Sequence, residues 1–178
     1  MSSPFAIDWH SFHKDFPVTL GIILINVSLF VLGKLGLIPS LVSIPEVLNL
    51  GTFGAHFFHF DLWHIGSNLL ILLLVGKILE PLLRWKLILL TISIWILTIL
   101  ILWYCNNVPV IGFSGIGMGL LTFAMCVCRR NPYWYSLLWP MVVINILFGL
   151  MPGISWWGHL GGAIAGLITF GIYKVLNR

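Results

Sequence analysis

Six long apolar runs are the feature of this sequence that most constrains its fold. They cover roughly residues 17–38, 62–79, 87–104, 114–128, 135–150 and 154–175. An α-helix needs about 20 apolar residues to cross the hydrocarbon core of a bilayer, which is about 30 Å thick. The first and last runs reach that length. The middle runs are shorter, which indicates helices whose ends lie inside the protein. We therefore predict an all-α membrane protein, a bundle of six transmembrane helices.

The scarcity of charge supports a lipid environment. Only 8% of the 178 residues are charged, 60% are hydrophobic, and the mean hydropathy is +1.06, whereas about 25% of the residues of a soluble domain are charged. So few charges cannot cover a surface that faces water. The basic residues are scattered singly or in pairs, which argues against nucleic acid as a partner. We predict one domain over residues 1–178, of which residues 1–16 form an amphipathic segment at the membrane interface.

The positive charges predict the orientation of the helices, because Lys and Arg accumulate on the cytoplasmic side of membrane proteins. If the N-terminus is cytoplasmic, Lys34 is the only one of the nine basic residues that lies outside. The other eight then lie inside: Lys14, Lys77, Arg84, Lys86, Arg129, Arg130, Lys174 and Arg178. We therefore predict that the N-terminus and the C-terminus are both cytoplasmic.

A serine and a histidine on two of the predicted helices lie at the same depth. Ser114 precedes Arg129 by fifteen residues, and His159 precedes Lys174 by fifteen residues. With a rise of about 1.5 Å per residue, both lie about 22 Å above the cytoplasmic boundary and about 8 Å below the outer surface. A hydroxyl and an imidazole at one depth can act as nucleophile and general base. The structural alternative is a packing seam in which Ser114 bonds to its own backbone.

Small residues flank this pair on both helices. Gly115 and Gly119 form one small-residue face, and Gly158, Gly162 and Gly166 form a longer one. Such faces let two helix backbones approach closely in lipid, where packing drives association. We therefore expect the fourth and sixth helices to touch, which would bring the serine and the histidine together.

Two further polar residues lie near the same depth on the second predicted helix. His64 and Asn68 are four residues apart, and hence on one helix face. An imidazole and an amide there can donate hydrogen bonds to a developing oxyanion, or they can simply join helices. Asp61 lies nearer the outer edge and Glu80 lies at the opposite end of the helix. The sequence therefore predicts a Ser-His dyad, with Ser114 as its nucleophile, and no carboxylate partner.

The serine and histidine motifs resemble those of the rhomboid family of intramembrane serine proteases, and the resemblance covers about residues 50–175. The segment Gly112–Gly115 looks like the nucleophile motif of that family. His159, followed by Gly162 and Gly166, looks like the family's base helix.

The second predicted helix resembles the same family. His64 with Asn68 matches its oxyanion motif. Gly76 with Glu80 matches a structural motif at the cytoplasmic end of that helix. His59 matches a further histidine that in the family belongs to the first external loop. These motifs occur in the order that the family has.

The resemblance implies a fold and an activity. The fold is a six-helix bundle in which the serine helix starts inside the molecule, beneath a water-filled external opening. The activity is a serine endopeptidase that needs no cofactor and cleaves single-span membrane proteins near the external end of the transmembrane segment. The compact six-helix form resembles bacterial members, which implies a bacterial inner (plasma) membrane.

Two departures from the family pattern concern specificity and rate. The Trp-Arg pair that is usual in the first external loop is missing, since the matching residues are Asn49–Thr52. Met118 stands where the family often has a tyrosine that stacks on the histidine. The short first loop and the segment Ala55–His59 also resemble rhombosortases, relatives thought to process C-terminal sorting tails.

Two other functions stay open as alternatives. His56, His59, Asp61 and His64 lie within nine residues and carry groups that bind divalent metals. No His-Glu-x-x-His motif accompanies them, so we predict no metal. A rhomboid-like pseudoprotease that binds membrane clients would typically lack the serine or the histidine, and both are present here.

Overall fold

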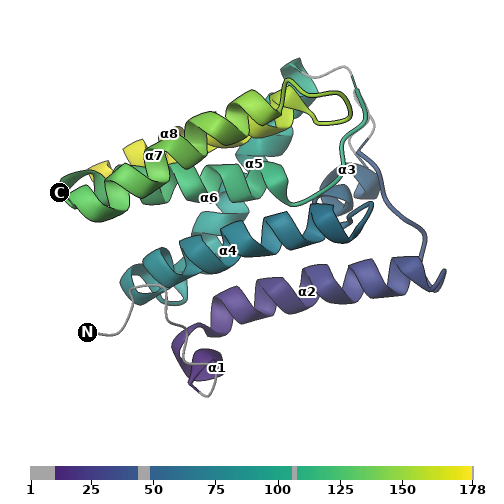
Figure 1. The fold of residues 1–178 in the computed structure, drawn as a ribbon, viewed down its shortest axis with the longest axis horizontal. Coiled ribbons are helices and arrows are strands. Elements are labelled where there is room, and N and C mark those ends of the chain that lie inside the picture. Colours follow the sequence, from purple (N-terminus) through teal and green to yellow (C-terminus); the bar gives the residue numbers. More distant parts are fainter. Residues whose placement is uncertain (1–10, 44–48, 106–107, 178) are drawn as a thin grey trace.

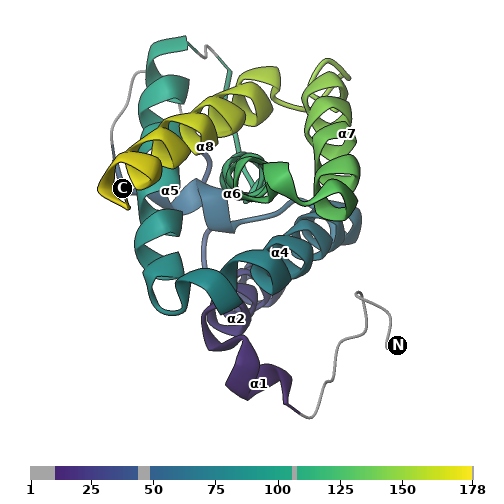
Figure 2. The same cartoon turned by 90° about the vertical axis from the view of Figure 1, so that its left-hand side faces the viewer.

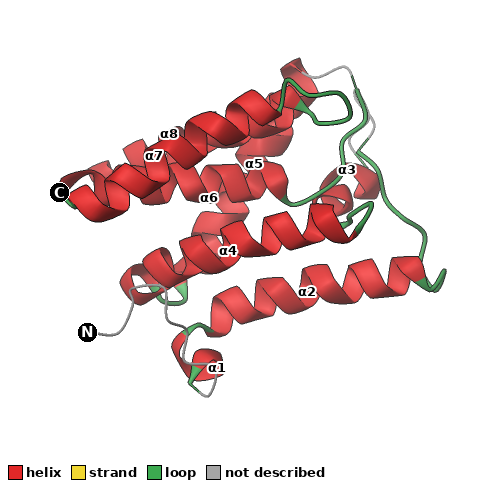
Figure 3. Cartoon of the chain, viewed as in Figure 1, coloured by secondary structure: helices red, strands yellow, loops and turns green. Residues whose placement is uncertain are grey.

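The computed structural model describes residues 11–43, 49–105 and 108–177 of the chain. Within these ranges the regular structure is helical (Figures 1 and 3), and one isolated bridge joins Ser43 to Val110. The helices are α1 (Phe12–Asp15), α2 (Pro17–Lys34), α3 (Leu50–Gly54), η1 (Ala55–Phe57), α4 (Leu62–Leu83), α5 (Lys86–Cys105), α6 (Ser114–Val127), η2 (Cys128–Arg130), α7 (Pro132–Phe148) and α8 (Trp156–Leu176).

The six predicted apolar runs correspond to the helices α2, α4, α5, α6, α7 and α8. Among the described residues, α2, α4, α5 and α8 are long and apolar enough to cross a membrane. The apolar helices α6 and α7 are shorter, with 14 and 17 residues. The predicted all-α membrane fold is confirmed. That all six of these helices cross the bilayer, and that both termini are cytoplasmic, remain predictions.

The short helix α6 lies in the centre of the bundle. Figure 2 shows it end-on, with α4, α5, α7 and α8 around it. Its residues Gly115–Ala124 are all buried. Because its neighbours are protein rather than lipid, α6 does not have to match the thickness of the bilayer, which explains the short fourth run.

Two helix boundaries differ from the predicted ones. The second predicted run ends at residue 79, but α4 continues through Pro81 to Leu83, and the chain turns at Arg84, which has φ 54°. Burial of this last turn outweighs the one hydrogen bond that a proline removes. The fifth helix was expected from residue 135, but α7 begins earlier. The side chain of Asn131 accepts a hydrogen bond from the N–H of Trp134 at 3.2 Å and caps the helix there.

The predicted interfacial segment is described only in part. Residues 1–10 lie outside the described residues. Phe12 begins α1 and is buried, and its ring centroid lies 5.2 Å from that of Phe16. The role of residues 1–16 at the membrane interface stays a prediction, as does the single domain over residues 1–178.

The helices α6 and α8 touch backbone to backbone. A Cβ atom at Gly162 would overlap the main chain of Gly115, and one at Gly166 would overlap the main chain of Gly119. A side chain at either position would push the two helices apart. This contact sets the distance between the start of α6 and the first turns of α8, where the serine and the histidine lie.

A buried carboxylate joins α4 to the start of α2. Glu80 is 2% exposed and accepts hydrogen bonds from the N–H of Val18 at 2.6 Å, from the N–H of Thr19 at 2.9 Å and from Thr19 Oγ1 at 2.5 Å. Gly76 packs directly against the side chain of Thr19. A negative charge is favourable at a helix N-terminus, where N–H groups lack partners. We propose that Gly76 and Glu80 are structural.

Glu80→Gln is expected to lower thermal stability in detergent more than it lowers activity per folded molecule. The amide keeps one acceptor oxygen but loses the charge and the second acceptor. One hydrogen bond to a charged group is worth about 1.5–3 kcal/mol. Thermal unfolding and activity of the folded fraction are the measurements. Asp15→Asn is the control, since it neutralises a carboxylate bonded to Ser11 on the surface. Unchanged stability with abolished catalysis would contradict the structural role.

Candidate active site

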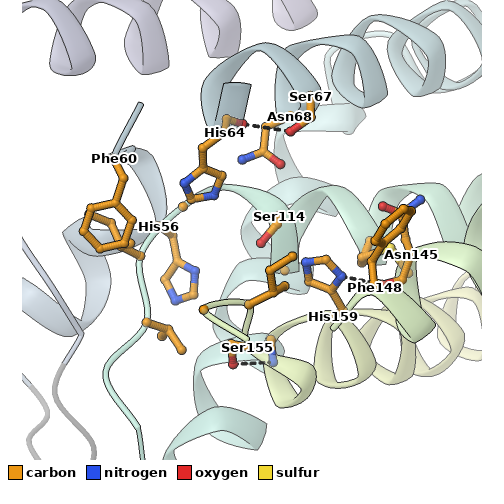
Figure 4. Close-up of a pocket in the computed structure, with 18 of the residues that line it drawn as sticks. His56, Phe60, His64, Ser67, Asn68, Ser114, Asn145, Phe148, Ser155 and His159 are labelled. Carbon is orange, nitrogen blue, oxygen red and sulfur yellow. Dashed lines mark hydrogen bonds between the residues drawn. The ribbon is translucent and has the colours of Figure 1, made fainter. Parts of the chain in front are cut away.

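A cavity of about 570 Å³ lies where α4, α6, α7 and α8 meet the loops at one end of the bundle (Figure 4). Its polar lining residues are His56, Asp61, His64, Ser67, Asn68, Ser114, Asn145, Ser155 and His159. Its apolar lining residues include Phe60, Trp63, Ile71, Met118, Phe148 and Ile154. All four residues predicted for catalysis and the oxyanion thus face one cavity, from α4, α6 and α8.

Ser114 is the first residue of α6, and the loop before it is held in place. Gly112 has φ 109°, in the region that favours glycine, and a Cβ there would overlap the ring of His64. The N–H of Gly112 donates to the carbonyl of Ala55 at 3.0 Å. The N–H of Phe113 donates to Nε2 of His59 at 3.4 Å. This turn places Ser114 at the N-terminus of α6. Its side chain lies among His64 and the other labelled residues of Figure 4.

His159 lies in the first turn of α8 and is 8% exposed. The side chain of Ser155 caps the helix by accepting from the N–H of Gly158 at 3.0 Å. On the ring, Nδ1 lies 2.6 Å from the main-chain carbonyl oxygen of Asn145. A carbonyl can only accept, so Nδ1 carries the proton and Nε2 keeps a free lone pair. The ring therefore has the tautomer that a general base needs.

His64 and Asn68 lie one turn apart on α4. Asp61 caps this helix, because its side chain accepts from the N–H of His64 at 2.8 Å. The Nδ2 atom of Asn68 is buried, and it has no hydrogen-bond partner among the described residues. A buried donor without a partner costs about 1–3 kcal/mol. Such a donor on the cavity wall is suited to an oxyanion that forms only during a reaction.

Two further histidines, His56 in η1 and His59 in the loop after it, contact the turn that precedes Ser114. Burial lowers the pKa of His56 from 6.5 to about 4. Burial, and then the neighbouring His64, lower the pKa of His59 from 6.5 to about 4. Both rings are therefore neutral at pH 7, and neutral His59 can accept the hydrogen bond from Phe113. Its ring also contacts that of His64 edge-on, with centroids 4.9 Å apart.

The described part of the chain contains no set of side chains that supports the metal-binding alternative. No three or more His, Cys, Asp or Glu side chains lie together there as a metal site requires. Of the four residues considered, Asp61 caps a helix and His59 accepts from a main-chain N–H.

Sequence reasoning missed the part that α7 plays in this site. Asn145 contributes its main-chain carbonyl, which no residue pattern reveals. Its side chain instead donates to the carbonyl of Met141 at 2.8 Å within the same helix. The available signal was a polar residue, Asn145, inside an apolar run. This signal could point to α7, but it could not show that the main-chain carbonyl contributes to the site. Ser155 was also missed, although a serine before an apolar run is a common helix cap.

The fold and the cavity define a class: an all-α membrane protein with a serine and a histidine facing one cavity. The family model described as Rhomboid domain matches residues 46–175. The chain belongs to the rhomboid family, as its motifs indicated. It is 33% identical over 136 residues to an uncharacterized protein of Mycobacterium bovis and, equally, to uncharacterized proteins of two strains of Mycobacterium tuberculosis. The match covers 67% of this chain and 57% of each relative's length.

Proposed function

We propose that this chain is an intramembrane serine endopeptidase that uses Ser114 as nucleophile and His159 as general base. The rhomboid family is a family of intramembrane proteases, which supports the class of reaction. The observation that carries the assignment is the ring of His159. Its Nδ1 is bonded to a carbonyl, and it shares one cavity with Ser114. That arrangement leaves Nε2 able to take the proton of the serine hydroxyl.

The proposed reaction has two halves. Ser114 Oγ attacks the carbonyl carbon of the scissile peptide bond while His159 Nε2 takes its proton. Hydrogen bonds stabilise the negative charge on the carbonyl oxygen; the donors are Nδ2 of Asn68, a ring N–H of His64 and the N–H of Ser114. His159 then gives its proton to the leaving amine, which leaves an acyl-enzyme. Water, deprotonated by the same histidine, releases the acid and restores the serine.

The proposed substrates are single-span membrane proteins in the lipid bilayer, cut near the external end of the membrane segment. The depth of about 8 Å below the outer surface supports this, because a soluble loop does not reach it easily. Both termini would be cytoplasmic, in a bacterial inner (plasma) membrane. Mass spectrometry of the products locates the cleaved bond. The likeness to rhombosortases stays a prediction.

Labelling with a serine-directed fluorophosphonate tests the proposal. The purified chain in detergent is expected to be labelled, and Ser114→Ala is expected to show no labelling. The reagent needs an activated serine but no membrane substrate, so it separates a protease from a pseudoprotease that only binds clients. Ser136→Ala is the control, since that exposed serine bonds to its own helix at Tyr133. Equal labelling of the native chain and Ser114→Ala would refute the proposal.

A further inference from the structure

The histidine proposed as base is joined to the end of α7 by one short hydrogen bond, the 2.6 Å contact from His159 Nδ1 to the Asn145 carbonyl (Figure 4). Among the described residues, this carbonyl is the hydrogen-bond partner of the His159 ring. Met118 follows Ser114 by one turn and is buried on the cavity wall, but a thioether is only a weak hydrogen-bond acceptor. The orientation of the ring therefore depends on α7.

Asn145 lies near the end of α7, where its carbonyl can accept a hydrogen bond from outside the helix. The helix ends at Phe148, and the carbonyls of its last turn have only weakened or shared helical hydrogen bonds. The N–H of Gly149 is shared between the carbonyl of Asn145 at 3.3 Å and that of Ile146 at 3.1 Å. Carbonyls at a helix C-terminus also carry partial negative charge. That charge stabilises the positive charge that His159 gains when it takes the serine proton.

Gly149 keeps this end of α7 against the start of α8. A Cβ atom at Gly149 would lie 2.8 Å from Cα of Trp156 and 3.2 Å from its Cδ1. A larger residue there must separate the two helices, because the main chain of Trp156 cannot move alone. Trp156 begins α8, three residues before His159. Displacing the end of α7 therefore displaces the Asn145 carbonyl from the ring.

We propose that the main-chain carbonyl of Asn145 positions His159, so that the base is oriented only while the end of α7 is packed against α8. This rests on the proposed function, since it concerns the same base. Asn145 is a positioning residue, because it acts through His159 and not on the substrate.

An ester in the main chain tests the contact without changing a side chain. Replacing the peptide bond between Asn145 and Ile146 by an ester makes this carbonyl a weaker acceptor. The same replacement between Val143 and Ile144 is the control, because it also removes one N–H from α7 but leaves the Asn145 carbonyl intact. We expect the first ester to label at least about tenfold more slowly with fluorophosphonate, part of the 10²–10⁴-fold that base assistance contributes. Equal rates in the two esters would overturn the proposal.

A pair of glycine variants tests the packing of the helix ends. Gly149→Ala is expected to slow labelling as the first ester does. Gly171→Ala adds the same methyl group to α8, where a Cβ meets nothing within 4 Å, and is expected to label at the native rate. If Gly149→Ala were labelled at the native rate, the packing of the end of α7 would not control the base.

The ¹⁵N spectrum of histidine-labelled protein gives a readout that does not depend on activity. Protonated and unprotonated ring nitrogens have different shifts, and the signals of His159 are those missing from His159→Ala. We expect protonated Nδ1 in the native chain and a mixture of tautomers in the Asn145–Ile146 ester. A mixture in a native chain that labels normally would overturn the positioning role alone. A fixed tautomer in a native chain that does not label would refute the proposed function and leave the positioning role standing.

Discussion

Ser114→Ala and His159→Ala are each expected to lose nearly all cleavage of a single-span membrane substrate. Without the hydroxyl there is no nucleophile, and without the imidazole nothing takes its proton. Base assistance alone contributes about 10²–10⁴-fold. Initial rates of cleavage in liposomes, at equal amounts of folded protein, are the measurement.

The double variant shows whether the two residues act as one unit. Ser114→Ala with His159→Ala is expected to be little slower than either single variant, because removing one member already disables the pair. Ser136→Ala and His13→Ala are the controls, since both positions are exposed. Substantial cleavage by Ser114→Ala would end the protease hypothesis at this site. Additive losses in the double variant would mean that the two side chains contribute separately.

The helices could be predicted from the sequence because apolar length is a local property. Each of the six runs corresponds to one helix, and the shortness of the middle runs indicated helix ends that lie inside the protein. The ends were less accurate. Whether α4 stops at Pro81 or two residues later depends on the burial of Glu80 and Leu83, which is decided by other helices. The residue pattern of α4 alone does not show which of its residues other helices cover.

The candidate site likewise has a part that the sequence could predict and a part that it could not. The helical rise predicts one depth for Ser114 and His159, and both residues line one cavity. The hydrogen bonds of main-chain groups could not be predicted, because every residue carries the same N–H and C=O. The carbonyl of Asn145 and the N–H of Phe113 are distinguished only by where the fold places them. Hence the sequence could indicate the side chains proposed to react, but not the main-chain groups that contact them.

Asn68→Ala is expected to have the next largest effect on turnover. Its Nδ2 is buried at the cavity without a partner among the described residues, so it is free to meet a charge that appears only in the transition state. Removal of one oxyanion donor typically lowers kcat by about 10²–10³-fold, or about 2.7–4 kcal/mol. KM should change little, because the neutral carbonyl of the bound substrate gains less from this donor than the oxyanion does.

Separate values of kcat and KM in liposomes decide between an oxyanion donor and other roles of Asn68. Asn26→Ala is the matched control, since Asn26 is also a buried asparagine, on α2, and its amide donates to the carbonyl of Ile22 at 2.8 Å. If both variants lost stability and activity together, Asn68 would be structural. If Asn68→Ala raised KM and left kcat unchanged, the amide would bind substrate in the ground state. A large fall in kcat for Asn68→Ala alone, at unchanged Tm and KM, is the result expected of an oxyanion donor.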